Sequence, residues 1–171
     1  FNQYTFRPVK VILAKNLVGK QFGKGFFAST EASDFENFKE GDKKIPYQIL
    51  AEAKGADLVG IRYEQLLPFT LPYQNPENAF RVISGDFVTT EDGTGIVHTA
   101  PTFGADDAKV AKEAVPEVPP MLVLDENGTP VPLVNLQGKF IDGLGTYSGK
   151  YVKNEYYTAA DGPAPERSVD V

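Results

Sequence analysis

The chain has 171 residues, of which 42% are apolar, so it is long enough to form one domain with a hydrophobic core. It has no cysteine, which excludes disulfides and thiolate zinc sites and suits a reducing, cytoplasmic compartment. Its net charge of -6 argues against an autonomous nucleic-acid binder, because phosphate contacts need clustered Lys and Arg, and no apolar run approaches the roughly 20 residues that cross a bilayer.

Both ends of the chain have the composition of cuts within a longer polypeptide. Phe1-Asn-Gln-Tyr4 already resembles a strand, and no signal peptide heads the chain. Arg167-Ser-Val-Asp-Val171 carries no helix stop and no tail composition. A processed natural terminus is the alternative. We therefore expect residues 1–171 to be a single, partial domain from a longer chain.

The first half of the chain predicts strands and one short helix. Val9-Lys-Val-Ile-Leu-Ala14 is β-branched and continuously apolar, as in a buried strand. Ser33-Asp-Phe-Glu36 matches a capping box and predicts a helix through Lys39 that ends at Gly41. Two further strands are expected at residues 45–53 and 58–63, on either side of a turn at Gly55. A third is expected at residues 81–90, after a proline-rich surface loop (residues 64–80).

The next segment predicts a turn followed by a helix. Asp92-Gly93 is a hairpin signal, which predicts that the preceding strand turns back into a second strand at Ile96-Val97 and runs to His98. Residues 105–114 have helical spacing, with Val110 and Ala111 facing inward. Pro116 then ends the helix. We expect this helix to begin between residues 104 and 107.

The last third of the chain contains more turn signals. Asn127-Gly128 predicts a hairpin between residues 121–124 and 131–133. Residues 138–149 are glycine-rich without the spacing of a phosphate loop, which is typical of a turn-rich barrel edge. Strands outnumber helices throughout, so the expected fold class is a β-rich α+β domain with a few short helices.

The stretch Gly93-Thr-Gly-Ile-Val-His-Thr-Ala-Pro-Thr-Phe-Gly-Ala-Asp-Asp107 concentrates the candidate functional residues. It holds the only histidine, His98, at the exit of a predicted strand, and two carboxylates, Asp106 and Asp107, at the start of a predicted helix. Functional groups gather on loops that rigid elements hold in place. A structural or solvent-facing role is the alternative for His98. A zinc site is disfavoured, because one histidine and no cysteine leave few ligands.

The two aspartates also have a structural explanation, since the helix dipole favours carboxylates in a first turn by ~0.3–1 kcal/mol. One of the pair can still face a pocket, where it would hold a substrate ammonium group through charge-assisted hydrogen bonds. Binding of a hard cation by Asp106 and Asp107 is a further alternative. The chain has no cysteine nucleophile, no Gly-x-Ser-x-Gly elbow and no dinucleotide or Walker pattern, so hydrolysis here would use a positioned water.

The 93–107 stretch resembles the signature of the editing domain of isoleucyl-tRNA synthetases. The sister domains of valyl- and leucyl-tRNA synthetases share the Gly-Thr-Gly start and the later acid but typically lack His-Thr-Ala-Pro. Val11-Ile-Leu-Ala14, Asp57-Leu-Val-Gly-Ile-Arg-Tyr63 and residues 140–157 are also similar to that family. The resemblance covers nearly the whole chain and is strongest at 93–107.

The resemblance implies a β-barrel-like editing domain that hydrolyses valine misattached to isoleucine tRNA, or valyl-adenylate. This family is the usual worked example of a binding site that discriminates too weakly over one methylene and needs a second, hydrolytic sieve. The partner implied is isoleucine tRNA through the full-length enzyme, with no DNA and no membrane. The domain itself would need no cofactor and no metal, whereas the parent catalytic domain would use ATP and Mg²⁺.

The same resemblance assigns roles to four residues. Asp107 matches the aspartate that holds the α-amino group of the misattached amino acid, and His98 matches the histidine that orients the aminoacyl group. Thr99 and Phe103 would line the wall of the pocket. The chain departs from the family in one respect: a threonine-rich peptide that forms the other half of the pocket is missing, and Phe69-Thr-Leu-Pro72 echoes it only superficially.

Two functional hypotheses therefore follow from the sequence. The first is a fragment of an editing hydrolase, in which Asp107 and His98 are catalytic and which is inactive in isolation. The alternative is a non-catalytic β-rich interaction domain in which Asp107 merely starts a helix. A threonine-rich peptide upstream of Phe1 would discriminate between them in favour of the first.

Overall fold

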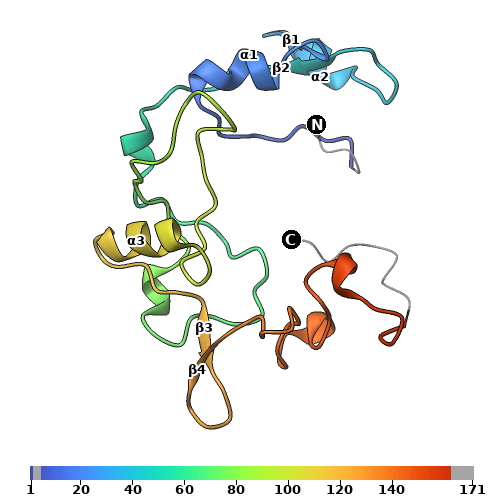
Figure 1. The fold of residues 1–171 in the computed structure, drawn as a ribbon. Coiled ribbons are helices and arrows are strands. Elements are labelled where there is room, and N and C mark those ends of the chain that lie inside the picture. Colours follow the sequence, from blue (N-terminus) through green and yellow to red (C-terminus); the bar gives the residue numbers. More distant parts are fainter. Residues whose placement is uncertain (2–4, 163–171) are drawn as a thin grey trace. The chain divides into compact units, whose positions relative to one another are not determined.

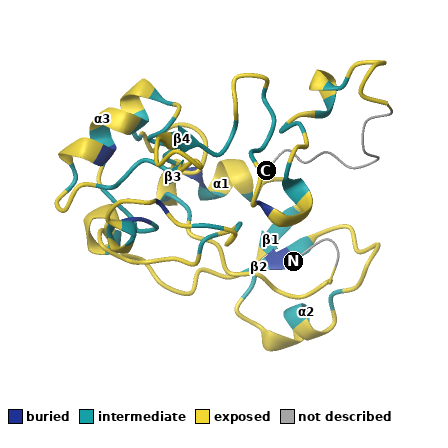
Figure 2. Ribbon diagram, turned by 90° about the horizontal axis from the view of Figure 1, so that it is seen from below, coloured by how far each residue is buried: buried dark blue, intermediate teal, exposed yellow. Residues whose placement is uncertain are grey.

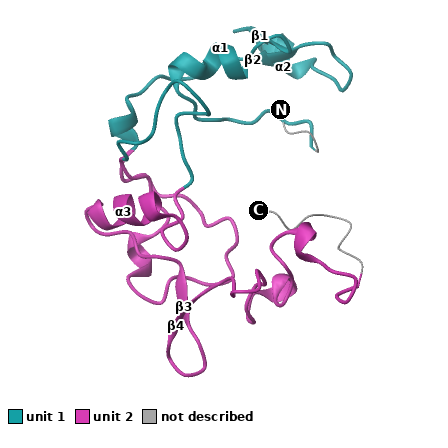
Figure 3. Ribbon diagram, in the orientation of Figure 1, with its two compact units in different colours: residues 1–58, 85–98 teal, residues 59–84, 99–171 magenta. Residues whose placement is uncertain are grey.

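The computed structural model describes residue 1 and residues 5–162, and the chain divides into two compact units (Figure 3). Unit 1 comprises residues 1–58 and 85–98, and unit 2 comprises residues 59–84 and 99–171. The chain therefore passes from one unit to the other three times. The expectation of a single domain stays a prediction, and each unit is described by itself.

Unit 1 contains a small parallel sheet (Figure 1). In this sheet β1 (Phe26–Ala28) pairs with β2 (Ile45–Tyr47). The Phe22 ring lies edge-on to Phe26 and stacks on Tyr47, each at a centroid distance of 5.0 Å, which covers the sheet with aromatic surface. The helical segments of this unit are η1 (Lys15–Leu17), α1 (Val18–Gln21), α2 (Ala32–Glu36) and η2 (Gly55–Leu58).

Unit 2 holds the longest helix and an antiparallel hairpin (Figure 1). Rings of Phe69, Phe140 and Tyr147 form an aromatic cluster, with Tyr147 lying 5.5 Å from Phe69 and 5.8 Å from Phe140. Leu144 beside them is buried. The regular elements of this unit are η3 (Pro76–Asn78), α3 (Ala105–Glu113), β3 (Leu122–Leu124), β4 (Pro130–Pro132), η4 (Gly145–Tyr147) and η5 (Asn154–Tyr156).

Helix α3 confirms the predicted position and orientation. It starts at residue 105, Ala111 is fully buried and Val110 partly so, whereas Lys109 and Lys112 are exposed (Figure 2). The Ala114 amide still donates to the Val110 carbonyl, and the helix has ended before the proline at 116, as expected for a residue without an N–H. None of the helices in the described residues has the length and apolar character needed to cross a membrane.

The Asn127-Gly128 hairpin is also confirmed. Strand β3 pairs with β4 antiparallel, with Val123 opposite Val131. The Asp125 carboxylate stabilises the turn, because its Oδ1 accepts hydrogen bonds from the amides of Asn127 and Thr129, both at 2.8 Å. This is the local side chain to backbone pattern that makes aspartate a favourable turn residue.

Most of the other predicted strands are wrong or much shorter than expected. Residues 9–14 form no strand: Val9, Val11 and Ile12 are 52%, 62% and 63% exposed, and within the described residues only the Ala14 amide of this segment finds a backbone acceptor. Strand formation needs a neighbour to pair with, and β-branched composition alone does not supply one. Only the first three residues of the predicted strand 45–53 are a strand, namely β2.

The predicted strands at 58–63 and 81–90 meet at a single point. Arg62 and Arg81 form an isolated antiparallel bridge, and the remaining residues of both segments are irregular. No strand follows at Ile96-Val97, although the chain does turn at residues 93–94. The predicted hairpin is therefore wrong except for its turn. This turn is held by side chains of α1 and not by a second strand.

The predicted capping box is wrong in its register. Helix α2 already starts at residue 32, so Ser33 lies inside the helix and cannot cap it, and the helix ends at Glu36 rather than continuing to Lys39. The hydroxyl that serves this end is Ser29, whose Oγ accepts the Glu31 amide at 3.0 Å and lies 2.5 Å from Asp34. A turn in which the Ser29 hydroxyl accepts a nearby backbone amide thus precedes the helix in place of the predicted capping box.

The expected barrel is not present in the described residues, which hold two separate two-stranded sheets. Residues 138–149 are rich in turns, as expected, but they form no barrel edge in the described residues, where isolated bridges join Val134 to Phe140 and Lys139 to Tyr151. The observed fold is a mixed α+β arrangement with short helices and short strands.

Candidate functional site

The start of the 93–107 stretch is a tight turn held by helix α1. The Gln21 amide nitrogen donates to the Gly93 carbonyl at 2.6 Å, and Lys20 Nζ lies 2.5 Å from Asp92 Oδ1. The hydrogen bond from Lys20, with the Gly93 amide adding to it, holds the pKa of Asp92 below its ordinary value. Both charged side chains are largely exposed, so the ion pair contributes little to stability and the neutral Gln21 contact is the better defined anchor.

The second glycine of the turn is required by a close approach of two backbones. The Ala14 amide donates to the Thr94 carbonyl at 2.9 Å, which brings Ala14 against Gly95. An added Cβ at Gly95 would lie 2.5 Å from the Ala14 Cβ, and the φ angle of Gly95 is +76°. Sequence reasoning did not predict the contacts of Ala14, Lys20 or Gln21 with this turn; the Gly-x-Gly spacing was the one signal that another segment must come close.

His98 is the last residue of unit 1, because the boundary between the units falls between His98 and Thr99. Its side chain is exposed and makes no hydrogen bond or ion pair with a described residue. Thr99 is half-buried, and the Phe103 side chain in unit 2 is 68% exposed. The hypothesis that His98 and Asp107 contact the same aminoacyl substrate stays a prediction.

The loop after His98 is a compact turn within unit 2. The Ala100 carbonyl accepts the amides of Phe103 at 3.1 Å and Gly104 at 3.2 Å, which closes the loop just before α3. Thr102 ties this turn to the segment before β3, because its Oγ1 accepts the Met121 amide at 2.9 Å. Thr102 was not among the predicted site residues, and its role is to position the loop.

Asp107 fastens the helix start to the same loop. It lies in the first turn of α3, is half-buried, and accepts the Ala100 amide through Oδ2 at 3.0 Å. Its carboxylate lies over Gly104, where an added Cβ would come within 2.5 Å of Oδ2. Oδ1 has no hydrogen-bond partner in the part of the chain that the structure describes. Asp107 therefore has a structural contact and a carboxylate oxygen that remains available to a ligand.

Asp106 differs from its neighbour, because it is exposed and has no partner among residues 5–162. Neither aspartate belongs to a cluster of three or more His, Cys, Asp or Glu side chains that could hold a metal, in the residues that the structure describes. Within unit 2 the 99–107 segment thus offers one anchored carboxylate and the turn that holds it, which suits binding of a cationic group better than nucleophilic chemistry.

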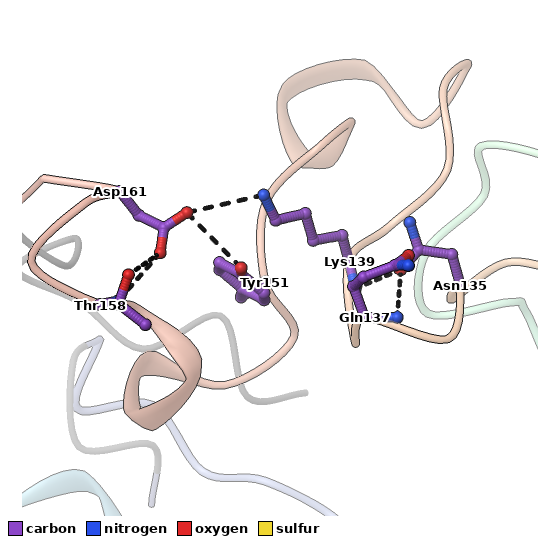
Figure 4. Close-up of polar contacts among 6 residues, drawn as sticks. All are labelled: Asn135, Gln137, Lys139, Tyr151, Thr158 and Asp161. Atoms are coloured by element: carbon purple, nitrogen blue, oxygen red, sulfur yellow. Dashed lines mark hydrogen bonds and ion pairs between the residues drawn. The ribbon is translucent and has the colours of Figure 1, made fainter.

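A second polar cluster lies near the end of unit 2 and was not predicted (Figure 4). Lys139 Nζ lies 3.7 Å from Asp161 Oδ1 and 4.4 Å from the centre of the Tyr151 ring. Thr158 donates to Asp161 Oδ2 through its hydroxyl at 2.6 Å and its amide at 3.0 Å, and these bonds hold the pKa of Asp161 below its ordinary value. The cluster fastens the segment around η5 to the preceding turns and is separate from the 93–107 stretch.

Comparisons with known proteins give a consistent result. No protein-family model matches the chain. The chain is 54% identical over 160 residues to the isoleucine–tRNA ligase of Cytophaga hutchinsonii, an alignment that covers 92% of this chain and 13% of that protein. It is 46% identical over 172 residues to the isoleucine–tRNA ligase of Bacteroides fragilis, covering 91% of the chain and 14% of that protein.

A third relative extends the same match. The isoleucine–tRNA ligase of Bacteroides thetaiotaomicron is 42% identical over 182 residues, again covering 91% of the chain but 15% of that protein. The chain thus spans 13% to 15% of the length of these curated relatives. What is matched is one segment of a much longer enzyme.

Proposed function

The chain belongs to the isoleucine–tRNA ligase family, in which it corresponds to one segment of a longer enzyme, and on that premise we propose that the segment is part of the proofreading domain. Its reaction would be the hydrolysis of valine misattached to isoleucine tRNA, or of valyl-adenylate, within an enzyme that attaches isoleucine to its tRNA. The observation that carries the proposal is the 93–107 stretch, which combines the family's editing signature with an anchored carboxylate at its end.

In this proposal Asp107 binds the α-ammonium group of the valyl moiety. Its Oδ2 is already held by the Ala100 amide, so the carboxylate is oriented before a ligand arrives and loses little conformational freedom when Oδ1 binds it. A charge-assisted hydrogen bond from an ammonium group to a half-buried carboxylate is stronger than a neutral one. This supports Asp107 as a substrate-binding group and leaves the attack on the ester to a water.

His98, Thr99 and Phe103 are proposed to complete the substrate contacts. The exposed imidazole of His98 can orient the aminoacyl group, and the exposed ring of Phe103 offers an apolar wall. A wall that admits valine and excludes isoleucine would supply the second sieve by size, because the two amino acids differ by one methylene. Loss of His98 should therefore alter selectivity more than it reduces the rate.

The alternative is that Asp107 only stabilises the start of α3 and that the segment is a non-catalytic interaction domain. Its position in the first helical turn and its bond to the Ala100 amide favour this alternative as much as they favour catalysis. The two hypotheses predict different effects of an Asp107 substitution on the hydrolysis of valyl-tRNA, so this substitution distinguishes them.

The experiment replaces Asp107 by alanine in a full-length isoleucine–tRNA ligase that contains this segment. Release of valine from valyl-tRNA for isoleucine should fall by about 30- to 1,000-fold, since losing the partner of a bound ammonium costs on the order of 2–4 kcal/mol. The rate of isoleucine activation, measured by pyrophosphate exchange, should be nearly unchanged. Asp106→Ala is the matched control, because it removes an adjacent, exposed carboxylate without a partner.

Normal valine release by the Asp107→Ala enzyme would remove Asp107 from the mechanism and favour the structural alternative. His98→Ala should relax the preference for valine over isoleucine, and unchanged rate and selectivity would give His98 a purely structural role. The isolated 171-residue chain should release valine no faster than the spontaneous rate, because a site without the threonine-rich wall cannot position the water. Rapid release that is lost on Asp107→Ala would overturn this part of the proposal.

A further inference from the structure

Unit 2 contains a pair of arginines that face each other across two chain segments. Arg62 and Arg81 form the antiparallel bridge between the segment after η2 and the segment after η3. The Tyr63 amide donates to the Phe80 carbonyl and the Val82 amide to the Ile61 carbonyl, so the arginine pair itself is not hydrogen-bonded through its backbone. Such pairs bring their side chains closest together, on the same face of the two segments.

Like charges directly opposite each other destabilise a β pair, so the arrangement calls for an explanation. The chain is acidic overall, with 23 Asp and Glu against 17 Lys and Arg, yet no carboxylate lies within ion-pair distance of either guanidinium in the described residues. The partners that both arginines do have are neutral. Their charge is therefore uncompensated on one face of unit 2.

The two guanidinium groups are held in place by main-chain carbonyls. Arg62 Nη2 donates to the carbonyls of Glu77 and Ala79. Arg81 donates to the carbonyl of Asn78 through Nε at 3.1 Å and to that of Pro116 through Nη2. Because the 77–79 carbonyls fix both heads at neighbouring points of one loop, neither side chain is free to turn toward a distant acid.

Each guanidinium keeps more than half of its N–H donors after these contacts, since arginine carries five. Arg81 uses its Nε–Nη2 edge for carbonyls, which leaves one N–H on Nη2 and both on Nη1 directed along the other edge. That edge matches two oxygens of a phosphate or carboxylate. Arg62 retains Nε and Nη1. Arg62 is exposed and Arg81 half-buried, so both can be reached from solvent.

We infer that Arg62 and Arg81 form a binding site for a phosphodiester group of RNA. This inference rests on the proposed function, because tRNA is the phosphodiester-containing substrate that the proposed function implies. Two pre-positioned guanidiniums with no carboxylate partner among the described residues are suited to a singly charged, two-oxygen group, and they place it on unit 2 beside the segment that follows α3. The site contributes binding and orientation and takes no part in the hydrolysis.

The test measures binding of the 171-residue chain to a labelled single-stranded RNA dodecamer by fluorescence anisotropy at about 20 mM salt and upward. Arg62→Gln and Arg81→Gln should each weaken binding about fivefold and reduce the slope of log K against log salt by about 0.7. Arg81→Lys, which keeps the charge but loses the planar edge, should fall between wild type and Arg81→Gln. Arg7→Gln in unit 1 is the matched control for one lost arginine charge, and its Kd should stay within about twofold of wild type.

Unchanged RNA affinity in both glutamine variants, or an equal loss in Arg7→Gln, would overturn the inference. An affinity for RNA no tighter than that for inorganic phosphate alone would make the pair an ion site only and would also overturn it. If the glutamine variants lose the exchange protection of the Val82 amide, Arg81→Lys decides the question, since it keeps a cation at the loop. This test reads binding and the Asp107 test reads ester hydrolysis, so failure of either proposal can be told from failure of the other.

Discussion

The contact between Gly95 and Ala14 offers a sharp test of how the 93–98 turn is held. Replacing Gly95 by alanine would place a Cβ 2.5 Å from the Ala14 Cβ and 3.5 Å from the Ala14 backbone nitrogen, closer than two carbon atoms can approach without displacement. It would also force an L-residue to adopt a φ of +76°. The turn that leads to His98 should therefore move away from Ala14.

The cost has two separable parts. The left-handed backbone conformation costs an alanine roughly 1–2 kcal/mol, and overpacking against the Ala14 methyl adds about 1–3 kcal/mol. Ala14→Gly removes the facing methyl and should restore the second part but not the first. The double variant should thus be more stable than Gly95→Ala alone, with a coupling free energy of about 1–3 kcal/mol in the double-mutant cycle.

Hydrogen exchange of the amide at residue 14 is the assay, because this amide donates to the Thr94 carbonyl at 2.9 Å. A destabilisation of about 2 kcal/mol or more accelerates its exchange by at least about 30-fold in Gly95→Ala. The acceleration should be smaller in the double variant. Exchange within about threefold of wild type in Gly95→Ala, or a double variant as labile as the single one, would refute the contact described above.

Gly104→Ala should displace the Asp107 carboxylate, because the added Cβ would lie 2.5 Å from Oδ2. The free energy of unfolding, measured in urea, should fall by about 1–2 kcal/mol. An unchanged midpoint of urea unfolding would contradict the contact between Asp107 and the loop. Because Thr158 lowers the pKa of Asp161, the stabilisation of the end of unit 2 should be complete above about pH 4 and lost as the pH falls below it, and Asp161→Asn should abolish that dependence of amide exchange. Asp125→Ala should cost the β3–β4 turn about 1 kcal/mol, seen as faster exchange of its two bound amides; unaltered exchange would exclude the carboxylate as the turn's anchor.

The candidate site divides between what the sequence could predict and what it could not. His98, Asp107, Thr99 and Phe103 were identifiable because their residue types and spacing form a recognisable stretch, and the helix start beneath Asp107 follows from the same residues. The contact of Asp107 with the Ala100 amide was not predictable, since it depends on how the intervening loop folds. This contact adds a loop anchor to the helix-start role that the sequence already offered for Asp107.

Features that the sequence by itself determined are those whose hydrogen bonds close within a few residues. The Asn127-Gly128 turn, with Asp125 as its acceptor, and helix α3 are of this kind, and both lie where the pattern predicts them. Local geometry suffices there, because every partner is supplied by the same short segment.

Only the tertiary structure decided the features whose partners lie far away along the chain. Residues 9–12 have the composition of a strand but, in the described part of the chain, no backbone hydrogen bond to a neighbouring segment, and Val9, Val11 and Ile12 stay exposed. Gln21 reaches the Gly93 carbonyl across 72 residues, and Arg62 meets Arg81 across a proline-rich loop. Strand pairing, the hydrogen bond from Gln21 and the Arg62–Arg81 bridge each need a partner from a distant segment of the chain. The local sequence pattern does not indicate which segment that partner comes from.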